Sequence, residues 1–163
     1  MGVLAVIILI FGFLGGIKEG VVKKAFSLVT LIIAIIFSGL LYSSMGSALS
    51  FLPDSNWENF TGFIVVFILA VILFSILSLM PRKAIETFCH EGVIYRLGGG
   101  VLNLFNTAVG ITVFSLLFIT FPVWTWMHEV LTGSGMIMGL ISLLSFVQGL
   151  LPEAFSYVSG TPV

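Results

Sequence analysis

Hydrophobic positions along the chain gather into four long apolar runs and a fifth, shorter one. The long runs cover residues 2–17, 25–42, 60–80 and 98–121, and the shorter run covers 136–151. A helix of about 20 apolar residues crosses the roughly 30 Å hydrocarbon core of a bilayer. The sequence therefore predicts an all-α membrane protein, with a four-helix transmembrane bundle as one domain over residues 1–121.

Prolines and polar residues predict where these elements end. The third run is expected to stop at Pro81 and the fourth at Pro122, because proline interrupts the helical hydrogen-bond ladder. The run 136–151 contains serines, glycines and a glutamine, and its length lies between that of a core helix and that of a span. Two alternatives remain for the C-terminal region 122–163: an amphipathic or re-entrant helix at the outer interface, or a fifth transmembrane helix.

The composition agrees with a membrane protein and makes several functions improbable. The chain is 59% hydrophobic and 8% charged, whereas a soluble domain has about 25% charged residues. A net charge of −1 offers no basic surface for nucleic acid. Cys89 is the one cysteine, so an intrachain disulfide or a cysteine-rich metal site is excluded. Without a recognisable catalytic, cofactor or metal motif, we expect a protein that is not an enzyme and has no cofactor.

The basic residues predict how the chain is oriented. All six lie in two links, the first and the third, and the link 43–59 has none but carries Asp54 and Glu58. Cytoplasmic loops carry an excess of Lys and Arg, so the two basic links are expected inside and the N-terminus outside. Trp57, Trp124 and Trp126 are then anchors at the outer interface. The basic residues are Lys18, Lys23, Lys24, Arg82, Lys83 and Arg96.

Small residues in the first run predict a close helix contact. Gly12, Gly16 and Gly20 recur every fourth residue, which places them on one side of a helix. Without a Cβ atom, a neighbouring backbone can approach closely, and such packing drives helix association in lipid. The neighbour is either the second or fourth helix of the same chain, or another copy in a homo-oligomer.

Polar residues in the fourth run suggest a second functional feature. Asn103, Asn106 and Thr107 are expected on one face, and amides at membrane depth need hydrogen-bond partners. This face is therefore expected to look into the bundle. It serves either as a source of interhelical hydrogen bonds or as a polar path for a small solute.

Two blocks of sequence indicate a relationship to a known protein family. Residues 20–30 contain a glycine, two apolar residues, a charged pair and then a small and apolar run, and residues 95–100 contain an arginine, an apolar residue and glycines. Together with the late Leu-Pro at 151–152, these blocks resemble the colicin V production protein (CvpA) family. Tyr95 departs from that pattern, because the family commonly has Asp there.

The resemblance implies a multi-pass protein of the bacterial inner membrane. It implies a role in colicin V production or export and in envelope homeostasis, and it brings no catalytic residues to this chain. We expect a non-enzymatic protein that works through contacts with the lipid bilayer and with membrane-protein partners or further copies of itself. The alternatives are a small transporter or channel, and an accessory subunit of a larger membrane complex.

Overall fold

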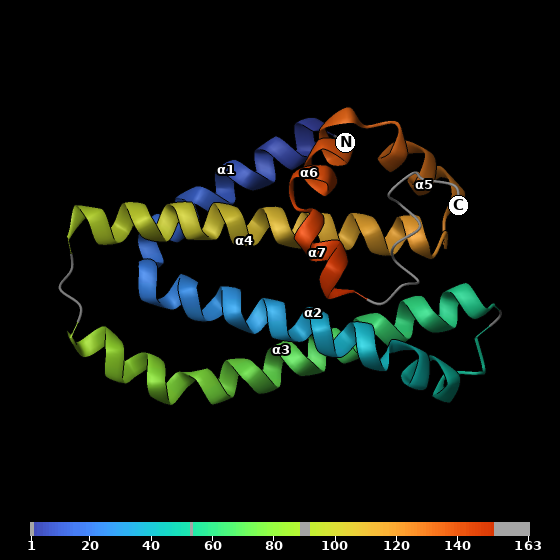
Figure 1. Ribbon diagram of the computed structural model, residues 1–163, viewed down its shortest axis with the longest axis horizontal. Helices are drawn as coiled ribbons and strands as arrows, with labels where there is room; N and C mark the ends of the chain where they lie inside the picture. The colour runs from blue at the N-terminus through green and yellow to red at the C-terminus, as the bar shows by residue number, and fades with distance from the viewer. Residues whose placement is uncertain (1, 53, 89–91, 152–163) are drawn as a thin grey trace.

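The computed structural model describes residues 2–52, 54–88 and 92–151, which are almost entirely helical (Figure 1). Four helices in this part of the chain are long and apolar enough to cross a membrane, which confirms the predicted all-α membrane fold. They are α1 (Gly2–Glu19), α2 (Val21–Ala48), α3 (Ser55–Phe88) and α4 (Val93–Thr120). Three short helices follow, α5 (Thr125–Thr132), α6 (Gly135–Leu143) and α7 (Ser145–Leu150).

The four long helices form an open row in the order α1, α4, α2, α3 (Figure 1). Helix α4 contacts α1 on one side and α2 on the other, and α3 packs chiefly on α2. Half of the residues in the most apolar 18-residue stretch of α4 are therefore buried, compared with 11% in that of α1. The end helices α1 and α3 expose large apolar side chains such as Phe11 and Leu73, which face hydrocarbon in a membrane.

The prediction that the third helix ends at Pro81 is wrong. Helix α3 continues to Phe88 with Pro81 inside it. Proline cannot donate to the Leu77 carbonyl, but Pro81 is exposed, so water or lipid headgroups can satisfy that carbonyl at the membrane surface. Beyond the apolar run, the last part of α3 turns toward the start of α4 (Figure 1). Hydropathy thus marks the membrane-crossing part of this helix rather than its end.

The fourth helix ends where the sequence predicts. Helix α4 stops at Thr120, two residues before Pro122. Beyond it, the Trp124 ring lies 5.9 Å from that of Trp57 at the start of α3, and the Phe60 and Phe118 rings lie 5.0 Å apart. Aromatic pairs in such edge-on arrangements contribute about 0.5–1.5 kcal/mol beyond their burial. This cluster ties the end of α4 to the start of α3.

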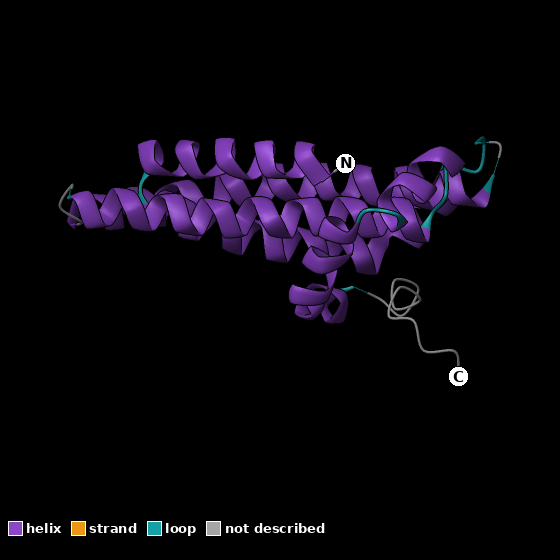
Figure 2. Ribbon diagram, turned by 90° about the horizontal axis from the view of Figure 1, so that it is seen from above, coloured by secondary structure: helices purple, strands orange, loops and turns teal. Residues whose placement is uncertain are grey.

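The C-terminal stretch 136–151 does not form one continuous helix. A break at Leu144 divides it into α6 and α7, which are nine and six residues long, and each is too short to span a membrane. The alternative of a fifth transmembrane helix is therefore wrong. Ile137, Ile141 and Val147 are buried in the same core as residues of α4, so the two helices pack onto the row. Figure 2 shows α7 on one face of it.

Candidate functional site: the contact of α1 with α4 and the polar pocket beside α2

The glycine stripe of α1 lies against the start of α4. A Cβ atom added at Gly16 would be 2.9 Å from the Gly100 Cα atom and would collide with the Gly99 carbonyl. A Cβ atom at Gly99 would in turn lie 2.6 Å from the Gly16 carbonyl oxygen. The two backbones therefore touch through glycines contributed by both helices. The glycine stripe of α1 therefore packs against a helix of the same chain.

Two further glycine contacts extend this interface along α1. Gly12 faces the side chain of Thr107, which leaves no room for a Cβ atom. Gly20 forms the turn between α1 and α2 with φ at +78°, a conformation that glycine adopts without strain. The Tyr95 ring also fills the space beside Gly20. The sequence predicted the α1 half of this contact and left the fourth helix as one of three alternatives for the partner, although the run Gly98–Gly100 was a visible signal in its favour.

Asn103 adds a hydrogen bond to the glycine contact, and Thr107 is hydrogen-bonded beside it within α4. The Asn103 side chain is buried and its amide nitrogen donates to the Gly12 carbonyl of α1. The Thr107 hydroxyl donates to the Asn103 carbonyl at 2.7 Å, within α4. Both polar groups are thus used inside the chain at a depth where unpaired groups are costly.

On this predicted polar face, Asn106 contacts α2, whereas Asn103 contacts α1. The Asn106 amide nitrogen donates to the Ser27 hydroxyl of α2 at 3.1 Å. Successive helical residues are about 100° apart, which is enough to turn Asn106 toward α2 while Thr107 faces α1. The side-chain carbonyl oxygen of Asn106 is buried and has no hydrogen-bond partner among the residues that the structure describes.

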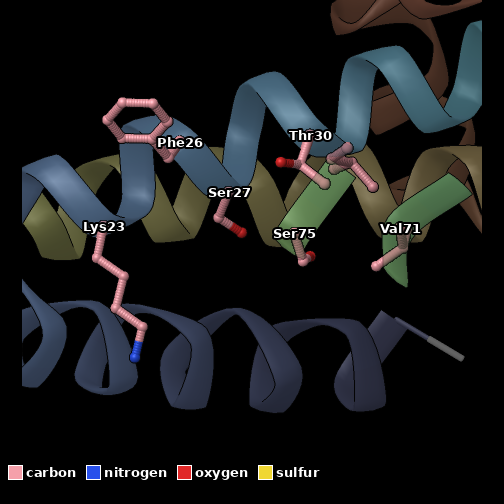
Figure 3. Close-up of a pocket in the computed structure, with 7 residues that line it drawn as sticks. Lys23, Phe26, Ser27, Thr30, Val71 and Ser75 are labelled. Atoms are coloured by element: carbon pink, nitrogen blue, oxygen red, sulfur yellow. The ribbon is translucent and has the colours of Figure 1, made fainter. Parts of the chain in front are cut away.

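A polar pocket lies beside α2 and α3, next to Ser27. Its volume is about 240 Å³. Figure 3 shows Lys23 and Ser27 projecting from the same side of α2, with Ser75 of α3 further along the pocket. Sequence reasoning missed these hydroxyls, although Lys23, Ser27 and Thr30 follow the spacing of one helix face. The lining residues are Lys23, Phe26, Ser27, Thr30, Leu31, Val71 and Ser75.

The basic segments meet at one end of the row. The turn between α1 and α2 and the adjoining ends of α3 and α4 lie at this end (Figure 1). Glu19 pairs with Lys23 at 2.6 Å and with Lys24 at 3.3 Å, and Lys18 is exposed. Arg82 and Lys83 belong to the last turns of α3, and Arg96 to the first turn of α4.

The family comparison follows the same helices. The family described as Colicin V production protein matches residues 2–137, which include all four long helices. The chain belongs to the colicin V production protein family. Its helices make it a membrane protein of that family, in agreement with the blocks at 20–30 and 95–100. Neither the curated proteins nor the solved structures contain a match.

Proposed function

We propose that this member of the colicin V production family is a non-enzymatic protein of the bacterial inner membrane. In this proposal it acts in colicin V production or export, and in envelope homeostasis, through contacts with other membrane proteins. One observation supports it: the buried Asn103 amide donates a hydrogen bond that ties α4 to α1, and the Thr107 hydroxyl is engaged within α4. Polar residues used in this way favour a scaffold over a path for a solute.

The surfaces left for partners are the ends of the row. Helix α3 packs chiefly on α2, and its outer side carries apolar residues that are more than half exposed, including Leu69, Leu73 and Ile76. The proposal also includes an orientation. The end that carries the six basic residues faces the cytoplasm, and the N-terminus faces outside.

A small transporter or channel is the second candidate. The Asn106 carbonyl without a partner and the nearby 240 Å³ polar pocket favour it, because a solute path needs polar groups that are not already paired. Such a path would have to pass from this pocket between the helices to the opposite end of the row.

Photo-crosslinking in cells tests the proposal. A photoreactive residue at Leu73 on the outer side of α3 is expected to crosslink to a second protein, and one at Phe11 would show whether α1 also serves as a contact. The matched control is Leu116, a leucine that is fully buried and should give no product with a second protein. Extraction in mild detergent and mass measurement should then show the same partner. A homo-oligomer without other proteins would favour the channel instead.

A further inference from the structure

The pocket beside α2 combines one ammonium group with several hydroxyl groups near the basic end of the row. Lys23, Ser27 and Thr30 come from one face of α2, and Ser75 comes from α3 (Figure 3). At about 240 Å³ the pocket is smaller than the roughly 300–1,000 Å³ of typical small-molecule sites. It therefore suits a single compact group, about the size of a lipid headgroup, rather than a large solute.

Each hydrogen-bonding side chain in this pocket can donate a hydrogen bond. Ser27 already accepts from the Asn106 amide, so its own hydroxyl hydrogen is free to point into the pocket. Among the residues that the structure describes, the Thr30 and Ser75 hydroxyls have no hydrogen-bond partner. Lys23 has three N–H donors, of which the Glu19 carboxylate needs one. Donors gathered in this way complement an anion with several oxygen atoms.

The net charge around the pocket also favours an anion. Glu19 is shared by Lys23 and Lys24, and Lys18 is exposed on the same turn. The single carboxylate therefore cannot neutralise the three ammonium groups. Each basic residue near a membrane surface contributes about 1 kcal/mol to the attraction of anionic lipid.

The position of the pocket near the basic end of α2 favours a membrane lipid as the source of that anion. Ser27 lies one helical turn past Lys23, or about 6 Å further along α2 toward its apolar middle. The polar region of each leaflet is of similar thickness, roughly 5–8 Å. Lys23 can thus meet a phosphate while Ser27 and Ser75 reach the ester oxygens below it. Phe26, Leu31 and Val71 supply an apolar wall for the start of the acyl chains.

We propose that this pocket binds the phosphodiester group of an anionic phospholipid. Lys23 pairs with the phosphate, and the hydroxyls of Ser27, Thr30 and Ser75 donate to phosphate or ester oxygens. This site is separate from the partner contacts proposed above, because it lies between helices of the chain rather than on the outer side of α3.

Native mass spectrometry of the full-length protein after delipidation tests this site. The probes are phosphatidylglycerol, phosphatidylcholine and inorganic phosphate. One phosphatidylglycerol is expected to bind more tightly than phosphatidylcholine, and inorganic phosphate only weakly. Equal binding of the two lipids would overturn the proposal, and phosphate that binds as tightly as phosphatidylglycerol would show a site for free phosphate instead.

Matched variants locate the lipid. Ser75→Leu fills the pocket without changing charge and is expected to weaken phosphatidylglycerol binding at least tenfold, whereas Ser43→Leu, on the exposed far part of α2, should leave it unchanged. Thr30→Val keeps the side-chain shape and tests the hydroxyl alone if Ser75→Leu does not fold. The affinity of this variant for phosphatidylglycerol is expected to fall about threefold, which corresponds to the loss of one neutral hydrogen bond.

Two charge-removing variants distinguish binding in the pocket from a general attraction of anionic lipid to the basic end of the row. Lys23→Gln is expected to weaken phosphatidylglycerol binding about fivefold. Lys18→Gln, which removes an exposed charge outside the pocket, should have less than half that effect. Equal losses in the two variants, or undiminished binding in both Ser75→Leu and Thr30→Val, would contradict the proposal.

Discussion

Gly16→Ala tests the close contact between α1 and α4 with the smallest possible change. The added Cβ atom would lie 2.9 Å from Gly100 Cα, while carbon atoms in ordinary contact are about 3.5–4.0 Å apart. The atoms that it meets include backbone, which cannot rotate away. The two helices therefore have to separate locally by roughly 0.5–1 Å, which forfeits a quarter to a half of the dispersion energy of each affected contact.

The expected loss of stability follows from that separation. Overpacking of this kind costs about 1–3 kcal/mol, and stretching the bond from Asn103 to Gly12 adds about 0.6 kcal/mol, the average for membrane hydrogen bonds. Gly15→Ala is the matched control, since its Cβ atom would meet only the Asn103 amide nitrogen at 3.7 Å, an ordinary contact. Both variants replace glycine by alanine in the same helix, so the gain in helix propensity cancels.

Thermal unfolding in mild detergent, followed by far-ultraviolet circular dichroism, measures the difference. For a chain of this size 1 kcal/mol corresponds to about 2–4 °C, so Gly16→Ala should melt roughly 3–14 °C below Gly15→Ala. Equal melting temperatures for the two variants would refute the reasoning, because they would show that the backbones are not in contact at Gly16.

Two further predictions concern topology and the contact of α2 with α3. In a cysteine-free background, cysteines at Lys23 and Arg82 should be shielded from an impermeant outside reagent, while one at Asp54 should be labelled. Labelling at position 82 from outside would contradict the orientation. Gly62→Ala should lower the melting temperature, because its Cβ atom would lie 2.7 Å from the Gly46 nitrogen, whereas Gly110→Ala meets no atom within 4 Å and should not. Equal melting of these two variants would count against the packing of α3 on α2.

The long helices could be predicted because hydrocarbon imposes a length and a composition on every span. The same information does not determine where a helix ends, and so α3 passes Pro81 although a proline usually stops a helix in water. The break at Leu144 could not be predicted from the sequence pattern either. Residues 136–151 are apolar enough to extend a single helix, and burial of Ile137, Ile141 and Val147 against α4 decides their fold instead.

The candidate site was predicted in part, for a related reason. The spacing of Gly12, Gly16 and Gly20 identifies a packing face, but the partner helix depends on the order of helices in the row, which hydropathy does not contain. The separation of Asn106 from Asn103 has the same origin. Helix α4 lies between two neighbours, so polar residues less than a full turn apart contact different helices.

The most direct test of the account concerns Asn106, because the central claim is that the polar residues of α4 have a structural role and do not form a path for a solute. Asn106→Leu loses one hydrogen bond to Ser27, worth about 0.6 kcal/mol, and also removes a buried carbonyl oxygen that has no partner. Its melting temperature should therefore stay close to that of the wild type, whereas Asn103→Leu should melt clearly lower.

Thermal stability and complementation of a strain that lacks the gene are to be measured on the same Asn106→Leu protein. The account predicts a stable protein that restores the phenotype, with Asn103→Leu losing stability and function together. A stable Asn106→Leu protein that fails to complement would contradict it, because function would then depend on the polar group itself, as a solute path requires.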